Sequence, residues 1–331
     1  MCVVGIDIAA KSFDLVVRRN GTNAKVRRFE QTPAGHAQAA AHLKKLAPER
    51  VVMEATGVYF VDLAVALHAA GLPVSVINPR SFKHFAQIKL KGSKTDAIDA
   101  ALLAEYAQRM APALWVPPAP DRLALRDLGR QINRLIHART QAKNRLHALQ
   151  ARRDVSALLI DDEREGIEQL DARIERLKGA AQQRIEQCAQ LSVMAQHLRC
   201  AKGLGAASTL AILAELCVLP TQMNSAQVSC FAGLDVRLNQ SGSSVHRPGR
   251  LSKAGNAYLR AALFMPAMVA VQSDPNAKAF YEALLARGKK RIQALCALMR
   301  KMLTGIWACI RNGTPFDSSR LFSCAQTLLK A

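Results

Sequence analysis

Short apolar runs alternate with turn and helix signals through the first third of the chain and predict five strands. They lie at residues 3–8, 12–19, 24–30, 50–56 and 73–78. Asn20-Gly21, between the second and third runs, predicts a hairpin because both residues tolerate positive φ. Helical patterns are expected from Thr32-Pro33 to about Leu46, from the fourth run to Ala70, after Pro79, and from near Thr95 to about Arg109.

The order of these elements predicts the class of the first domain. Three hairpin-linked strands are followed by strands that helices separate, which is the ribonuclease-H-like pattern of antiparallel strands extended by parallel ones. A doubly wound nucleotide-binding fold would instead show strict alternation of strands and helices. Residues 1–118 are therefore predicted to form an α/β domain that ends in the proline-rich joint Pro117-Pro118-Ala119-Pro120.

After this joint the apolar positions adopt a heptad spacing. It is kept by Leu125, Leu128, Ile132, Leu135, Ala142, Leu146 and Leu149, and again by Ile167, Leu170, Ile174, Leu177, Ala181, Cys188 and Leu191. Residues 119–200 are predicted to hold two long helices, either as an antiparallel coiled-coil hairpin or as helices that pair with another subunit. Residues 201–331 are predicted to form a third, mainly helical segment.

The charge balance indicates a polyanionic partner. The 331 residues include 46 Lys and Arg against 25 Asp and Glu, a formal net charge of +21, and nucleic acid is the commonest partner of so basic a chain. The basic outer face of the first long helix is either a solvated surface or an arm that faces nucleic acid. Aromatic residues make up only 5%, which argues against a sheet that stacks bases on its rings.

Two cellular settings are disfavoured. Apolar runs of the roughly 18–20 residues that a spanning helix needs are missing from the sequence, so no membrane association is expected. The eight cysteines are scattered without C-x-x-C spacing, which excludes a zinc ribbon and disfavours a disulfide framework. A reduced, cytoplasmic protein that associates with the nucleoid is the expectation.

Carboxylates recur where the predicted strands end. Asp7 ends the first strand, Glu54 lies on the fourth, and Asp96 and Asp99 share one face at the start of a helix. In the predicted sheet the first and fourth strands are parallel neighbours, so these acids should converge. Without a cation these acids would repel each other, and Mg²⁺ is the natural cation for such oxygen ligands. A purely structural role is the alternative to metal binding. Asp96 would then be the N-terminal charge of its helix, and Asp99 would pair with Lys94.

The last segment carries two phosphate-binding candidates. Gly203-Leu204-Gly205 precedes an apolar helix and is similar to a helix-hairpin-helix turn, although Gly-x-Gly is often only a turn. A loop rich in serine and cations follows, and Ser241 stands within it. Its cations are Arg237, Arg247, Arg250, Lys253 and Arg260. The loop either grips phosphate or supplies a serine nucleophile, for which Ser243, Ser244 and Ser252 are chemically equivalent candidates.

Together these motifs resemble the DEDD-type insertion-sequence transposases, a group of bridge-RNA-guided recombinases. The resemblance spans nearly the whole chain. It rests on Gly-Ile-Asp7-Ile-Ala-Ala-Lys, Glu54-Ala-Thr-Gly-Val-Tyr, Val-Ile-Asn-Pro, Lys94-Thr-Asp96-Ala-Ile-Asp99-Ala, Gly-Leu-Gly, Phe231-Ala-Gly-Leu, Ser241-Gly-Ser-Ser-Val, Arg250-Leu-Ser-Lys-Ala-Gly-Asn, Leu-Arg-Ala-Ala-Leu and Met-Pro-Ala-Met-Val-Ala.

The resemblance implies a RuvC-like first domain whose Asp7, Glu54, Asp96 and Asp99 bind Mg²⁺. It further implies a C-terminal transposase domain in which Ser241 attacks DNA and forms a transient phosphoserine linkage. Partners implied by the family are donor and target DNA, an element-encoded bridge RNA that selects both, and further copies of the chain in a tetramer or dimer of dimers, assembled through the coiled coil.

The sequence therefore predicts a site-specific DNA recombinase with Ser241 as nucleophile. Nucleic-acid contacts are expected from Lys94, Gly203, Gly205 and the cations of the serine loop. Two alternatives stay open. One is a junction-resolvase-like nuclease that uses the carboxylates with water as nucleophile, and the other is a nucleic-acid-binding regulator without catalysis.

Overall fold

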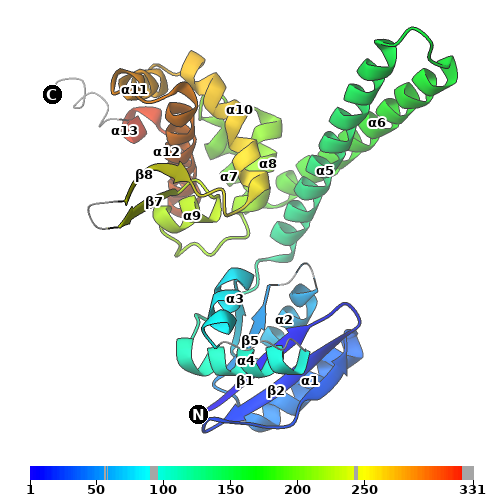
Figure 1. The fold of residues 1–331 in the computed structure, drawn as a ribbon, viewed down its shortest axis with the longest axis vertical. Coiled ribbons are helices and arrows are strands. Elements are labelled where there is room, and N and C mark those ends of the chain that lie inside the picture. Colours follow the sequence, from blue (N-terminus) through cyan, green and yellow to red (C-terminus); the bar gives the residue numbers. More distant parts are fainter. Residues whose placement is uncertain (56, 58, 90–95, 242–244, 323–331) are drawn as a thin grey trace. The chain divides into compact units, whose positions relative to one another are not determined.

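The computed structural model describes residues 1–55, 57, 59–89, 96–241 and 245–322 (Figure 1). The chain is divided into two compact units, Met1–Pro117 and Pro118–Ala331. The first is an α/β unit and the second is mainly helical. The three segments expected from the sequence stay a prediction; in the second unit, the long-helix segment and the C-terminal helices share one hydrophobic core.

One mixed sheet forms the centre of the first unit. Its strands are β1 (Cys2–Ile8), β2 (Ser12–Arg19), β3 (Thr22–Asn23), β4 (Arg27–Glu30), β5 (Arg50–Glu54) and β6 (Val74–Ile77). The order is β3-β2-β1-β5-β6, with β4 also paired to β2. β1 pairs antiparallel with β2, whereas β1, β5 and β6 run parallel. This topology confirms the predicted ribonuclease-H-like order and the parallel pairing of the first strand with the strand that carries Glu54.

The third predicted strand, residues 24–30, is a strand only over Arg27–Glu30 (β4), and the short strand β3 (Thr22–Asn23) precedes it. Arg18 pairs with Asn23 and Leu15 pairs with Arg27, so the three residues 24–26 lie opposite only two residues of β2. One extra residue in a strand of an antiparallel pair is a β-bulge, which bends the strand and redirects side chains. The sequence pattern did not reveal it, because Ala24-Lys25-Val26 continues a plausible strand composition.

Helices cover both faces of the sheet. They are α1 (Pro33–Leu46), α2 (Phe60–Ala69), α3 (Pro79–Ile88) and α4 (Asp96–Met110). The face of β1 that carries Ile6 packs with Leu43 of α1 and Leu63 of α2, whereas Val3 belongs to a cluster with Phe82 of α3 and Leu103 of α4. Thr32 caps α1 by accepting a hydrogen bond from the Gly35 backbone N–H at 3.1 Å, as its position before a proline predicts.

A glycine brings α4 unusually close to the central strand. A Cβ atom on Gly5 would stand 2.2 Å from the Ala100 carbonyl oxygen and 2.2 Å from the Ala104 nitrogen. Only glycine fits there, and the close approach places the α4 face of β1 directly beneath the helix. Because side chains alternate along a strand, Asp7 lies on the same face as Gly5.

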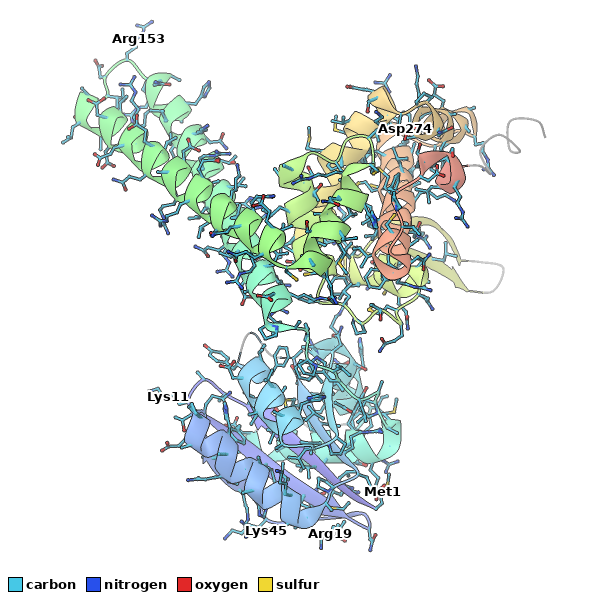
Figure 2. All side chains as sticks on the ribbon, turned by 180° about the vertical axis from the view of Figure 1, so that it is seen from behind. Met1, Lys11, Arg19, Lys45, Arg153 and Asp274 are labelled. Carbon is cyan, nitrogen blue, oxygen red and sulfur yellow. The ribbon has the colours of Figure 1, made fainter. Side chains whose placement is uncertain are left out.

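The second unit begins with a long helical hairpin. It consists of α5 (Pro120–Gln150) and α6 (Ala157–Gln187), which pack against each other, with Arg153 at the turn between them (Figure 2). The predicted heptad positions Leu125, Ile132 and Ile174 are buried. These contacts favour the intramolecular hairpin over helices that pair only with another subunit.

Shorter helices and one small sheet complete this unit. They are α7 (Ala189–Arg199), α8 (Ala206–Leu216), α9 (Ser225–Phe231), β7 (Val236–Ser241), β8 (Val245–Leu251), α10 (Ala257–Ser273), α11 (Pro275–Ala286), α12 (Arg291–Asn312) and α13 (Ser318–Phe322). Trp307 of α12 is fully buried, and its indole N–H donates to the Met223 carbonyl at 2.8 Å. The base of α5 joins this core through α8.

The serine-rich segment is a hairpin rather than the loop expected from its composition. β7 and β8 form a two-stranded antiparallel sheet in which Ser241 pairs with Val245. Val236 and Leu238 remain 50% and 68% exposed. A strand with little burial on either face shows no clear apolar alternation, which is why the sequence pattern indicated a loop.

Within the described residues, no helix is long and apolar enough to cross a membrane. The seven cysteines of this part of the chain are free thiols.

Candidate active site

The candidate site begins at Asp7, near the carboxyl end of β1. Asp7 is half-buried on the sheet face that α4 covers. Ile6 pairs with Met53 in the parallel register of β1 and β5, so Asp7 and Glu54 occupy neighbouring positions one residue further along. Asp96 and Asp99 lie in the first turn of α4. The fold thus brings four acids that are distant in sequence toward one end of the sheet.

Electrostatics connect these four groups. The pKa of Asp7 is raised from 3.8 to about 6, first by burial and then by the negative charges of Asp99, Asp96 and Glu54. A hydrogen bond from the Ile8 backbone opposes the shift. Asp7 therefore lies within the field of all three other acids that the sequence singled out.

The donor set suits a divalent cation. Carboxylate oxygens are the ligands that such ions take, and a cation would relieve the repulsion that raises the Asp7 pKa. In the described part of the chain, however, no three acidic, histidine or cysteine side chains stand close enough to form a closed ion cage. The residues fit a metal by their chemistry, and their role as ligands remains a prediction.

The sequence did not reveal an ion pair, Asp14 with Arg28, that lies beside these four acids. Asp14 of β2 is paired with Asp7 in the strand register, and its side chain is only 5% exposed. Arg28 of β4, its partner on the other side, donates from Nε and Nη2 to the two Asp14 oxygens at 2.7 and 2.8 Å. The cost of burying an unpaired charge applies to Asp14 as it does to Asp7, and this signal could have identified it.

Arg28 also extends toward the predicted ligands. Its Nη2 lies 3.7 Å from Oδ2 of Asp96, and both side chains are largely exposed. Asp96 consequently has a cationic neighbour on β4 as well as its place at the start of α4. The alternative pairing of Asp99 with Lys94 cannot be described, because Lys94 lies outside the described residues.

In the second unit, Ser241 is the last residue of β7, and its side chain lies outside the described part of the structure, as does that of Arg247. The other predicted cations differ in their surroundings. Arg237 and Arg250 are exposed and directly opposite each other in the register. Two like charges in this arrangement repel each other, and an anion between them would relieve that repulsion.

Two further cations lie at the base of the hairpin. Arg260 donates from Nη1 to the Ala232 carbonyl at 2.9 Å, which gives it a structural task. Lys253 is exposed in the left-handed conformation, with φ of 51°, and its backbone N–H donates to the Gly233 carbonyl at 3.1 Å. The Ser252 hydroxyl donates to the Asp235 carboxylate and helps to close the hairpin.

The Gly203-Leu204-Gly205 turn has a packing explanation. Gly203 has φ of 93°, and a Cβ there would lie 2.5 Å from the Pro266 carbonyl oxygen of α10. Gly205 is the N-cap of α8, and no described atom lies within 4 Å of its added Cβ. A close helix contact accounts for Gly203 without a ligand, whereas the open surroundings of Gly205 leave its phosphate-binding role as a prediction.

A buried polar network, also missed from the sequence, joins α5 to the start of α10. Glu215 of α8 is buried and accepts from Nε and Nη2 of Arg130 at 2.7 and 2.9 Å. It also accepts from the Asn256 amide at 2.5 Å, and Asn256 caps α10 by accepting from the Leu259 N–H. The base of the helical hairpin is thereby tied to the segment that follows β8.

A ribonuclease-H-like sheet with acids gathered at one end, joined to a basic helical unit, defines an enzyme that acts on DNA. Residues 4–151 match a family model described as "Transposase", and residues 195–282 match that of the "Transposase IS116/IS110/IS902 family". The chain belongs to the IS110 family of DEDD transposases. This finding confirms the family resemblance that the sequence motifs indicated.

Full-length relatives support the assignment. The pilin gene-inverting protein of Moraxella lacunata is 30% identical over 95% of this chain and 97% of its own length. A probable family 20 transposase of Pseudomonas aeruginosa is 26% identical over 94% of this chain and 97% of its own. Among solved structures, Thermus thermophilus RuvC with a Holliday junction substrate is similar over 34% of this chain and 98% of its own, with 19% identity and a TM-score of 0.27.

Proposed function

We propose that this transposase is a site-specific DNA recombinase in which Asp7, Glu54, Asp96 and Asp99 hold Mg²⁺ and Ser241 is the nucleophile. The observation that carries the metal assignment is the position of Asp7, a half-buried carboxyl whose pKa three other acids raise. Such a cluster is poised to bind a divalent cation, because the ion would remove the repulsion between its members.

Each residue then has a defined task. When bound, Mg²⁺ would supply positive charge for the phosphate oxygens and orient the scissile group. The Ser241 oxygen would form a bond to phosphorus while a DNA hydroxyl leaves, giving a phosphoserine linkage that rejoining later breaks. The phosphate backbone would be held by cations, namely Arg237, Arg250, Lys94, Arg247, Lys253 and Arg260. The open Gly205 N-cap would add a further phosphate contact. Gly203 would support that contact by shaping the turn.

The partners follow from the family. Donor and target DNA are the proposed substrates, and a bridge RNA from the element would select both by base pairing. The α5–α6 hairpin would mediate assembly into a tetramer or dimer of dimers, in which domains of different copies complete each active site. The net charge of +21 supports extensive contact with nucleic acid.

The decisive experiment uses the full-length protein with candidate bridge RNA, both DNA partners and Mg²⁺. Recombinant junctions and a denaturation-resistant protein–DNA adduct are expected with the wild-type protein. Ser241→Ala should abolish both products while retaining RNA and DNA binding. Asp7→Asn, or chelation of the metal, should also abolish them.

The outcomes separate the alternatives. Cleavage that needs metal and Asp7 but survives Ser241→Ala would identify a junction-resolvase-like nuclease that uses water. Nucleic-acid binding without cleavage under any of these conditions would identify a regulator. Wild-type adduct formation by Ser241→Ala would contradict the assignment of the nucleophile.

A further inference from the structure

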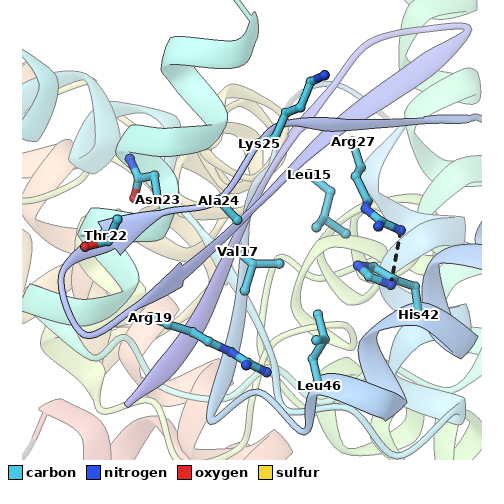
Figure 3. Close-up of a pocket in the computed structure, with 10 residues that line it drawn as sticks. All are labelled: Leu15, Val17, Arg19, Thr22, Asn23, Ala24, Lys25, Arg27, His42 and Leu46. Atoms are coloured by element: carbon cyan, nitrogen blue, oxygen red, sulfur yellow. Dashed lines mark hydrogen bonds between the residues drawn. The ribbon is translucent and has the colours of Figure 1, made fainter.

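A basic groove lies in the first unit on the sheet face opposite Asp7. Its volume is about 390 Å³, and its apolar floor is formed by Leu15, Val17 and Leu46 (Figure 3). Arg19, Arg27 and His42 line its walls. Because Leu15 and Val17 alternate with Asp14 and Val16 along β2, the groove and the acids occupy different faces of the sheet.

Cations on the two faces of this sheet have different hydrogen-bond partners. On the α4 face, Arg28 forms a bidentate pair with Asp14, and Arg18 donates to Gln108 and Asn23. On the groove face, Arg27 donates from Nη1 to Nδ1 of His42 at 3.5 Å, as the dashed line in Figure 3 shows. Neither Arg19 nor Arg27 has a carboxylate within 4.0 Å in the described structure, and none of the ten lining residues is acidic.

The β-bulge adds a third cation. Ala24 continues the pairing with Val17, and Val26 packs with Val16 on the α4 face, so Lys25 is the extra residue. Its side chain projects from the sheet edge at the rim of the groove (Figure 3). Bulges often redirect a side chain next to a functional site. Here the bulge adds a third exposed cation to the residues that line the groove.

The local field is correspondingly positive. The pKa of His42 is lowered by burial first and then by Arg27 and Lys45. Lys45 and Arg19 lie at the same end of the first unit (Figure 2). An anion in the groove would lower this repulsion in the same way that a cation would at the acids.

We propose that this groove binds the sugar–phosphate backbone of a single strand of nucleic acid. Three cations without described acidic partners offer contacts for backbone phosphates, and the floor of Leu15, Val17 and Leu46 offers an apolar surface for a sugar or an unstacked base. A duplex keeps its bases inside and would present only phosphates to the rim, so it would leave the floor without a ligand. The groove is distinct from the proposed catalytic site and holds a strand while the opposite face works on DNA.

Protection of Lys25 tests the site directly in the full-length protein. Lysine acetylation is measured by mass spectrometry with and without a short oligouridylate or an oligothymidylate of equal length, in chelator. Bound strand should reduce acetylation of Lys25 several-fold while Lys289, an exposed lysine of the second unit, changes little. Protection by only one oligonucleotide would identify RNA or DNA as the ligand. Unchanged Lys25 reactivity at saturating oligonucleotide would overturn the proposal.

Matched charge variants provide the second test. The variant Arg19→Gln/Lys25→Gln/Arg27→Gln should bind single strands about 10-fold more weakly, and its log–log salt slope should fall by about 2, because each lost single-strand phosphate contact contributes about 0.7. The control Arg287→Gln/Lys289→Gln/Arg291→Gln removes the same charge from exposed positions elsewhere. Equal losses in both variants, or a loss confined to duplex binding, would contradict a single-strand groove.

These measurements do not depend on the recombination chemistry. Binding is recorded in chelator, and none of the altered residues belongs to the acids or to the serine hairpin. A protein that fails to recombine DNA could still show the groove, and an active recombinase could still lack it.

Discussion

The half-buried Asp7 and the buried Asp14 are paired in the register of β1 and β2, and they differ in what balances their charge. Asp14 accepts both hydrogen bonds of the Arg28 fork, whereas Asp7 has no cation within 4.0 Å among the described side chains. Bidentate pairing with Arg28 gives Asp14 a structural task. Asp7 is left as the acid whose charge a bound ion would balance.

The charge state of Asp7 should make stability depend on pH. Its folded pKa of about 6 lies above the ordinary value of 3.8, so the folded state holds the proton more tightly and loses stability as pH rises through this interval. Asp7→Asn should match the wild type below pH 3.8 and exceed it above pH 6. After discounting for partial exposure, the gain is on the order of 1–2 kcal/mol in urea unfolding with chelator.

Addition of Mg²⁺ provides the control for this prediction. The ion should stabilise the wild-type protein and leave Asp7→Asn almost unchanged, which narrows the difference between them. If the stabilities of Asp7→Asn and the wild type differ by the same amount below pH 3.8 and above pH 6, the proposed repulsion between Asp7 and the other acids is contradicted.

Arg28 and Arg27 are adjacent in sequence and form a matched pair for mutation. Arg28→Ala leaves the Asp14 carboxylate buried without its partner, so we expect a clear fall in the free energy of unfolding at neutral pH, larger than that for Arg27→Ala. Arg27→Ala removes an exposed cation that has no described carboxylate partner and should cost less than about 0.5 kcal/mol. Similar urea midpoints for the two variants would contradict a structural ion pair.

At the residue scale, the sequence predicted the positions of Asp7 and Glu54 but not the neighbouring ion pair of Asp14 and Arg28. Asp7 and Glu54 were placed together because apolar runs identified β1 and β5, and parallel pairing follows from the helical crossover. Asp14 and Arg28 depend on the exact register between β2 and β4. That register is shifted by the bulge, which composition does not reveal.

At the scale of elements, helices were predicted more completely than the small sheet. The spacing of Leu125, Ile132 and Ile174 indicated α5 and α6, because a buried stripe repeats at the helical period. β7 and β8 lack an equivalent signal, since Val236 and Leu238 stay exposed. An element without a buried face leaves little trace in the pattern of apolar residues.

The turn before α8 provides a test of packing against ligand binding. Gly203→Ala would place a Cβ 2.5 Å from the Pro266 carbonyl oxygen in a left-handed conformation, so we expect a loss of more than about 2 kcal/mol in stability. Gly205→Ala has open space and ordinary φ, and the weaker N-cap should cost less than about 1 kcal/mol. Thermal unfolding of both variants measures the difference.

The ligand hypothesis makes the opposite ranking for DNA binding. If Gly205 contacts a phosphate, its alanine variant should bind DNA more weakly despite near-normal stability. Equal destabilisation by the two substitutions would contradict the packing explanation for Gly203.

At the scale of the whole molecule, positive charge is present in both units. The groove of the first unit and the opposed Arg237 and Arg250 of the second carry cations without described acidic neighbours. The total of +21 therefore includes local surfaces where phosphates can bind, as well as the general solvation of a basic protein.

Duplex binding should consequently depend steeply on salt. We expect the affinity of the full-length protein for non-specific duplex DNA to fall roughly 1,000-fold between about 50 and 200 mM salt, as for proteins that neutralise six to ten phosphates. Fluorescence anisotropy over this range measures the slope, and Asp7→Asn, which removes no cation, serves as the control. A nearly flat salt dependence would show that the charge is not used for backbone contact.

The break between β3 and β4 has a consequence for how copies of the chain can meet. An open sheet border exposes backbone groups that can recruit a strand from another molecule, and a bulge with charged side chains blocks that addition. On the opposite border, the backbone N–H of Trp115 donates to the Val74 carbonyl at 2.8 Å, so part of the open edge of β6 is already hydrogen-bonded. With one border kinked and cationic and the other partly occupied, self-association through this sheet is disfavoured, and copies of the chain would meet through other surfaces.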